Sequence, residues 1–127
     1  MILSFDYDRN YFPAFPVVEM GVVATAGGQK QTVVGLIDSG SDATQIPQQI
    51  LLAIGAREID RRWVRDLYGI RHPAPIYGVQ IEIGDFLLPG IEVIGRPGID
   101  EIIVGRDVLN QLIVTLNGLA HVAEVRD

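Results

Sequence analysis

Apolar side chains recur in short blocks along this chain, and glycine or proline stands between most of the blocks. Val17–Val23 and Gln31–Ile37 lie on either side of Gly27-Gly28, and they predict two strands joined by a turn. From Tyr77 to Ile83, apolar residues occupy every second position, which is the period of a half-buried strand. This patterning predicts a mostly β protein.

Other segments complete the predicted set of elements. Pro47–Gly55 predicts a short helix, because its proline suits a first turn and its glycine suits the position past the end. Arg106–Leu112 predicts a second short helix. Asn117-Gly118 predicts a two-residue turn between the last two strands. The remaining strands are expected at Ile91–Ile94, Glu101–Val104, Ile113–Leu116 and Leu119–Val125.

Two regions are expected to depart from this regular pattern. The charged stretch Arg57–Asp66 and the strand that ends at Ile83 predict a long hairpin, with Pro73 and Pro75 at its tip. Residues 1–16 predict an irregular N-terminal arm. Because no linker-like tract divides the sequence, a single domain over residues 1–127 is expected.

Composition removes several classes of function. The 127 residues include no cysteine, which excludes disulfide scaffolds and thiol-based metal or redox sites. With 2 histidines and no ligand spacing among the acids, neither a metal nor another cofactor is expected. The formal net charge is −6, and the 4 arginines of Arg57–Asp66 stand among 3 acids, so no nucleic-acid partner is expected.

The chain is nevertheless rich in apolar residues. They make up 48% of it, with a mean hydropathy of +0.27, yet no run approaches the roughly 18 apolar residues of a membrane span. Acids near the N-terminus do not fit a signal peptide. We therefore expect a soluble, cytoplasmic protein that binds no membrane and buries some apolar surface against another chain.

The sharpest local motif is Asp38-Ser39-Gly40, directly after an apolar strand. The tripeptide alone says little, since an Asp-Ser/Thr-Gly occurs by chance in roughly one chain in fifteen of this length. Its position favours a functional role, because a carboxylate at a strand end can be shielded from water. The glycine also lets backbone N–H groups turn toward the carboxylate. An ordinary Asx turn is the structural alternative.

A second motif lies far downstream, where a buried strand, a glycine and a short helix follow one another over Glu101–Leu112. Taken in order, Leu36–Thr44 and Ile102–Leu109 resemble the retropepsin family of aspartic proteases, which includes the retroviral enzymes and their bacterial relatives. The resemblance extends from Val17 to the C-terminal hairpin. It implies a retropepsin-like acid protease β-barrel with one or two short helices, assembled as a symmetric homodimer.

The resemblance also implies a role for individual residues. Asp38 corresponds to the catalytic carboxylate, and Ser39 to the hydroxyl residue that ties two active-site loops together. Gly40 permits the turn of the loop, and Ser41 stands where alanine is common. Arg106 corresponds to an arginine that pairs with an acid of the active-site loop, here Asp42; two unrelated surface charges are the alternative.

The flap is where the sequence departs from the family. Retroviral flaps are richer in glycine than this hairpin, and its prolines predict a stiffer tip. Tyr68, Gly69 and Ile70 are the candidate flap residues for substrate binding. Trp63 and Tyr77 are candidates either for substrate contact or for packing.

The mechanism of an aspartic protease requires one ionised and one protonated carboxylate side by side. This chain has a single Asp-Ser/Thr-Gly motif and therefore supplies only one of them. A two-fold axis beside Asp38 supplies the second from another copy, with Leu119–Val125 as the candidate interface strand. The sequence thus predicts a homodimeric aspartic endopeptidase that cleaves extended peptides. The alternative is a catalytically inactive retropepsin-like module for dimerisation or peptide binding.

Overall fold

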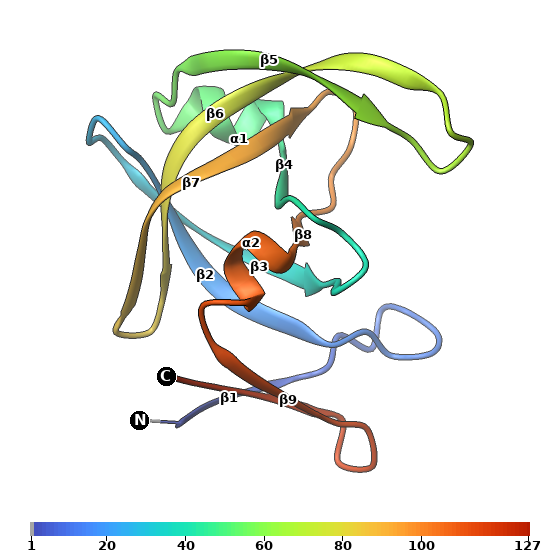
Figure 1. The fold of residues 1–127 in the computed structure, drawn as a ribbon. Helices are drawn as coiled ribbons and strands as arrows, with labels where there is room; N and C mark the ends of the chain where they lie inside the picture. Colours follow the sequence, from blue (N-terminus) through green and yellow to red (C-terminus); the bar gives the residue numbers. More distant parts are fainter. Residues whose placement is uncertain (1) are drawn as a thin grey trace.

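The computed structural model describes residues 2–127 and is built mainly of strands (Figure 1). Its mostly β character and its two short helices confirm the predicted fold class. In chain order the elements are β1 (Ile2–Asp6), β2 (Val17–Ala24), β3 (Lys30–Ile37), β4 (Gln45–Pro47), α1 (Gln48–Ala53), β5 (Glu58–Arg65), β6 (Arg71–Ile83), β7 (Phe86–Arg96), β8 (Ile103–Val104), α2 (Arg106–Leu109), β9 (Ile113–Asn117) and β10 (Val122–Arg126).

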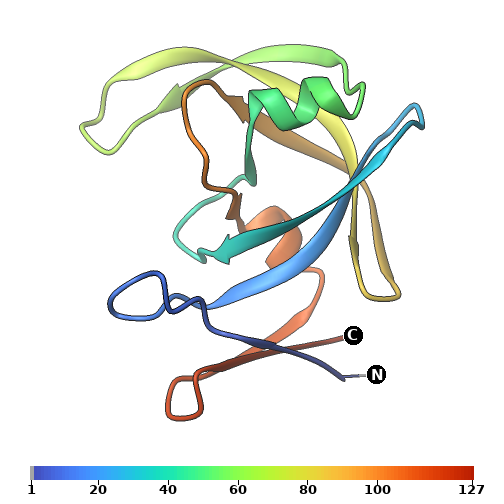
Figure 2. The ribbon, with the colours of Figure 1, turned by 180° about the vertical axis from the view of Figure 1, so that it is seen from behind.

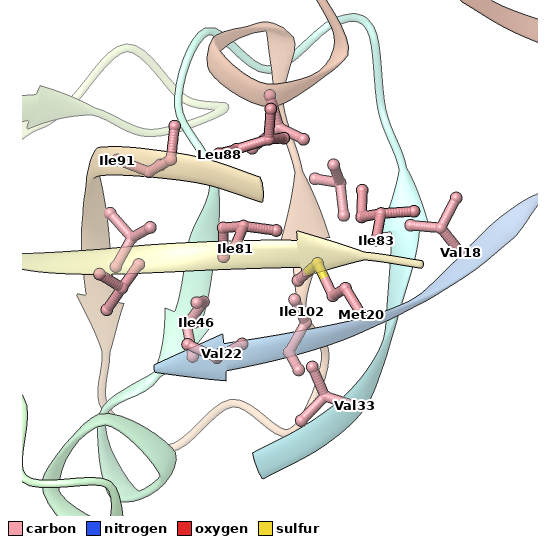
Figure 3. Packing of buried hydrophobic residues seen from close by; sticks show 14 of the residues in the cluster. Val18, Met20, Val22, Val33, Ile46, Ile81, Ile83, Leu88, Ile91 and Ile102 are labelled. Atoms are coloured by element: carbon pink, nitrogen blue, oxygen red, sulfur yellow. The ribbon is translucent and has the colours of Figure 1, made fainter. Parts of the chain in front are cut away.

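Seven strands form one sheet that closes on itself. Their order is β2-β3-β8-β4-β7-β6-β5, and an additional pairing joins β2, at one end, to β6, the strand before β5 at the other end. Closure leaves an interior filled mostly by apolar side chains, as the alternation from Tyr77 to Ile83 in β6 predicts. Met20, Val22 and Ile81 meet there from neighbouring strands, with Ile46 of β4 beside them (Figure 3).

The short strand β8 brings the two sequence motifs together. It runs parallel to β3, with Leu36 opposite Ile103 and Ile37 opposite Val104. Gly35 allows this close approach, because a Cβ atom there would lie 2.5 Å from a methyl group of Val104. The two motifs of the sequence therefore lie side by side in the barrel, although more than sixty residues separate them.

Both predicted helices are present and shorter than expected. Pro47 precedes the first residue of α1, and Gly55 follows its end with a φ of +79°, which is the conformation that glycine favours. The predicted second helix extended to Leu112, but α2 ends at Leu109. Beyond it, the amides of Gln111 and Leu112 bond three residues back, so the chain continues in tight turns.

The predicted irregular N-terminal arm is wrong for residues 2–6. These residues form β1, which pairs with β10, and β9 completes a three-stranded terminal sheet. The physical reason is that Leu3 and Phe5 alternate with polar residues and pack against the core. Met1, also part of that prediction, lies outside the described residues. Residues 7–16 contain only an isolated bridge between Asp8 and Phe15.

The predicted two-residue turn at Asn117-Gly118 is also wrong. Asn117 pairs with Val122, so the turn comprises residues 118–121. The side-chain oxygen of Asn117 accepts a hydrogen bond from the amide of Ala120 at 3.0 Å, which stabilises this wider turn.

The long hairpin of β5 and β6 is present, but the prolines do not form its tip. Pro73 lies opposite Trp63 and Pro75 lies opposite Arg61, both within paired strands. The tip is residues 66–70, where one carboxylate oxygen of Asp66 accepts the amides of Tyr68 and Ile70 at 2.9 and 3.0 Å. This Asx-type turn has Gly69 at a φ of +78°, so the turn chemistry rather than proline decides where the hairpin reverses.

Among residues 2–127, the helices are far too short to cross a bilayer.

Candidate active site

Asp38 lies immediately after β3, at the point where β8 runs alongside it. Its amide donates to the carbonyl oxygen of Val104 at 3.0 Å, which continues the β3–β8 pairing by one residue. The amide of Gly40 donates to a carboxylate oxygen of Asp38 at 2.9 Å, and the amide of Ser41 bonds to the Asp38 carbonyl at 3.2 Å. The half-buried carboxylate is therefore held at the strand end by its own turn.

Arg106 contacts this loop from the start of α2. Its guanidinium donates to the carbonyl oxygen of Ser39 at 2.8 Å, and its amide donates to the carbonyl of Ser41 at the same distance. The predicted Arg106–Asp42 ion pair is wrong: no such pair forms within residues 2–127. The physical reason is that the guanidinium reaches backbone carbonyls, while Asp42 is exposed and faces a cleft.

The pairing that joins the two motifs is instead between Thr44 and Asp107. The Thr44 hydroxyl donates to one carboxylate oxygen of Asp107 at 2.6 Å, and the Thr44 amide donates to the other at 3.0 Å. The same hydroxyl accepts the Gly105 amide at 3.1 Å. Thr44 is the fully buried polar residue of the described chain and Asp107 is half-buried, so water is excluded from the Thr44 end of this network.

Asp107 lies in the first turn of α2. The residue that caps α2 is Gly105, and the Asp107 carboxylate accepts the amide of Val108 at 2.9 Å within the first turn. No local signal identifies Thr44 as its partner, because the two residues are 63 positions apart. The pairing of β8 with β3 and with β4 brings them together.

Gly105 allows this junction to be tight. A Cβ atom there would lie 2.6 Å from the carbonyl carbon of Ala43 and 2.9 Å from the carbonyl oxygen of Ser41. Such distances are too short for any side chain, and both neighbours are backbone atoms that cannot rotate away. The glycine between β8 and α2 is therefore required by the approach of the Asp38 loop.

A cleft of about 550 Å³ separates the far end of this loop from the β5–β6 hairpin. Ala43 and Gln45 line it on the loop side, and Ile76 and Ile94 form an apolar wall. The hairpin contributes mostly charged and aromatic groups. Asp38 itself does not line this cleft in the single chain, so the cleft and the carboxylate are neighbouring features joined by residues 42–45.

Comparisons with known proteins agree with this architecture. A crystal structure of a retropepsin-like aspartic protease from Rickettsia conorii superposes with a TM-score of 0.64, covering 98% of this chain and 91% of that chain, at 9% identity. The fold is that of retropepsin-like aspartic proteases. A scan of protein-family models and a search of curated proteins find no match to the sequence.

The predicted flap residues lie on the hairpin of β5 and β6, whose tip projects from the barrel (Figure 1). Tyr68 and Ile70 are exposed, and Tyr68, Gly69 and Ile70 do not line the cleft in this chain. Trp63 is 64% exposed and does line it. Tyr77 is buried, and its hydroxyl accepts a hydrogen bond from the side-chain amide of Gln48 at 2.9 Å, which is a packing role.

The charged groups of the described chain show no arrangement suited to a metal ion. Residues 2–127 contain no group of three histidine or acidic side chains that could ligate one. The one tyrosine with a clearly shifted pKa lies outside the cleft. Tyr11 donates to a carboxylate oxygen of Glu101 at 2.5 Å, and this hydrogen bond raises the pKa of Tyr11 to about 12.

Proposed function

We propose that this chain is a single retropepsin-like domain that works as a homodimeric aspartic endopeptidase, with Asp38 from each copy at the centre. The observation that carries the proposal is the position of Asp38. Its carboxylate stands at the end of β3, beside β8, and its oxygen accepts the Gly40 amide. A carboxylate in such a turn is fixed in direction before a substrate arrives, as catalysis requires.

The reaction needs the second copy. When two carboxylates lie a hydrogen bond apart, they share one proton, as in aspartic proteases generally. The ionised Asp38 takes a proton from water, and the oxygen of that water attacks the peptide carbonyl carbon. The protonated Asp38 of the other copy donates its proton to the carbonyl oxygen. Collapse of the tetrahedral intermediate, with a proton delivered to the leaving nitrogen, breaks the C–N bond.

One side of the molecule suits the two-fold axis that this chemistry needs. The Asp38 loop, the 8–15 loop, the 66–70 tip and the 118–121 turn all project toward it, to the right in Figure 1 and to the left in Figure 2. Phe12 and Leu119 are fully exposed on two of these segments. Large apolar side chains that protrude without cover are typical of surfaces buried on association.

Burial within the single chain leaves only part of the expected interface strand Leu119–Val125 accessible to a partner. Ala123 and Val125 are already fully buried within the single chain, where β10 lies between β1 and β9. They are therefore not available to a partner. From this segment we propose Leu119 as the interface residue, together with Phe12 from the 8–15 loop. Ser39 is exposed beside Asp38, where its hydroxyl can reach the loop of the other copy.

The substrate is proposed to lie extended in the cleft, beneath the flap hairpin. The main-chain groups of an extended peptide can pair with strand edges and loops, and its side chains then select for sequence. Tyr68, Gly69 and Ile70 close over it when the hairpin moves inward. Their exposure in the single chain fits a tip that gains its contacts only from substrate or from the other copy.

The test is peptide cleavage between pH 3 and 7 by the wild type, by Asp38→Asn and by a matched control, Asp85→Asn, which changes an exposed acid in the β6–β7 turn. We expect acid-shifted cleavage that pepstatin inhibits, that Asp38→Asn abolishes and that Asp85→Asn retains. Sedimentation should show that Asp38→Asn remains a dimer. Activity of a monomer would contradict the shared site, and a dimer that binds but cuts no peptide would favour the inactive peptide-binding module.

A further inference from the structure

The cleft is basic, although the chain as a whole is acidic. Its lining includes four arginines and three acids, whereas the whole chain has 10 basic and 16 acidic residues. Four of the ten basic side chains therefore face one cavity. The arginines are Arg62, Arg65, Arg71 and Arg96, and the acids are Asp42, Asp66 and Glu92.

Only one of these arginines is neutralised by the protein itself. Arg62 pairs with Glu92 at 2.9 Å and with Asp60 at the same distance. Of the acids, Asp66 uses a carboxylate oxygen to accept two amides of its own turn. Arg65, Arg71 and Arg96 form no ion pair with any residue in 2–127.

Two of the unpaired arginines lie directly opposite each other. Arg65 on β5 and Arg71 on β6 are register partners at the last pair before the flap tip. Like charges at such positions repel and destabilise the pair of strands. The Arg71 guanidinium lies 5.7 Å from the centre of the Trp63 ring, which holds it in place without neutralising it. Arg96 donates only to the neutral side chain of Gln45.

From this arrangement we infer that the cleft selects peptides with an acidic side chain, whose carboxylate binds between Arg65 and Arg71. The inference rests on the proposed function, since it names the substrate class of the same cleft. A carboxylate between two guanidinium groups accepts charge-assisted hydrogen bonds from both and removes their repulsion. Trp63 and the apolar wall at Ile76 and Ile94 then contact the rest of the peptide.

A protein or peptide fits this cleft better than a nucleic acid. Four of the ten basic residues line the cavity, Asp42 and Asp66 lie in it with them, and the rest of the chain is acidic. A phosphate backbone with a charge at every nucleotide would meet those acids as well as the arginines. A single carboxylate needs only the space between Arg65 and Arg71.

The first experiment compares peptides that differ only in charge. A scan places Glu or the isosteric Gln at each of four positions on either side of a cleaved bond, and kcat/KM is measured at pH 6, where glutamate is ionised. We expect Glu to be favoured about fivefold at one position, as for a partly exposed ion pair, with the preference falling in high salt. Equal rates for every Glu and Gln peptide would overturn the inference.

Substitutions test whether Arg65 and Arg71 cause the preference for Glu. Arg65→Gln and Arg71→Gln should each remove most of the preference for Glu, whereas Arg57→Gln, the same change outside the cleft, should leave it unchanged. Arg71→Glu should prefer Lys at the responsive position. A preference that survives Arg65→Gln with Arg71→Gln would place the carboxylate elsewhere and contradict the assignment.

A binding measurement separates this inference from the proposed activity. Fluorescence anisotropy with the Asp38→Asn protein at pH 7 compares the labelled Glu and Gln peptides without any cleavage. If the wild type cuts nothing but the Glu peptide binds more tightly, the proposed function fails and the inference stands. If cleavage occurs without any difference in binding, the inference fails alone. Stronger competition by a single-stranded oligonucleotide than by the Glu peptide would also overturn it.

Discussion

Replacement of Thr44 by valine tests whether the two halves of the site are joined as the structure shows. Valine has nearly the same shape, so the core remains filled while the hydroxyl is lost. That hydroxyl donates to Asp107 at 2.6 Å and accepts the Gly105 amide at 3.1 Å. A hydrogen bond to a charged group contributes ~1.5–3 kcal/mol, and a buried amide left without a partner costs ~1–3 kcal/mol.

Asp107 keeps the amides of Thr44 and Val108, so the low end of each range applies. We expect Thr44→Val to lower the free energy of unfolding by about 2.5 kcal/mol, and the Tm by about 10 °C. Urea unfolding followed by circular dichroism, at one protein concentration, measures the difference.

Two control substitutions test whether the loss of stability in Thr44→Val comes from the missing hydroxyl. Thr44→Ser keeps the hydroxyl and should cost only about 1 kcal/mol for the lost methyl group. Thr32→Val makes the same chemical change at an exposed position of β3 and should stay within about 0.5 kcal/mol of the wild type. If Thr44→Val is as stable as Thr32→Val, the hydroxyl does not join the two motifs and the reasoning is refuted.

The other predictions concern the glycine, the arginine, the N-terminal loop and the association surface. Gly105→Ala should lower stability by about 2–3 kcal/mol in urea titrations, because its methyl group would lie 2.6 Å from backbone of Ala43. Arg106→Gln should lower kcat about tenfold, because the Ser39 carbonyl loses its donor at 2.8 Å and the loop shifts. The circular dichroism spectrum should stay native. An unchanged kcat would contradict a positioning role for Arg106. The pKa of Tyr11 is raised to about 12 by its hydrogen bond to Glu101, so the unfolded chain loses this proton at lower pH than the folded one. Stability should therefore fall as the pH rises from about 10 through about 12, and Tyr11→Phe should flatten that part of the urea-midpoint profile. Leu119→Asn should weaken self-association in sedimentation without lowering the Tm of the monomer, since this side chain is fully exposed.

Local patterns in the sequence contain much of the information about the barrel and about Asp38. The alternation from Tyr77 to Ile83 in β6 predicts which of its side chains fill the interior, because burial follows the period of the strand. The Asp38-Ser39-Gly40 turn is likewise local, since the Gly40 amide that holds the carboxylate is only two residues away. The hairpin of β5 and β6 also follows from its pattern. The predicted position of its tip was wrong, because the Asp66 turn, rather than the prolines, reverses the chain.

Contacts across the fold required the tertiary structure. The sequence by itself determined that an acid follows a buried strand and that a glycine precedes a short helix. It did not determine that Asp107 binds Thr44, or that Arg106 binds the carbonyl of Ser39 rather than Asp42. Those partners are 63 and 67 positions apart, and no periodicity relates them. The pairing of β8 with β3 and with β4 decides them, because a side chain bonds to whichever group the backbone places within its reach.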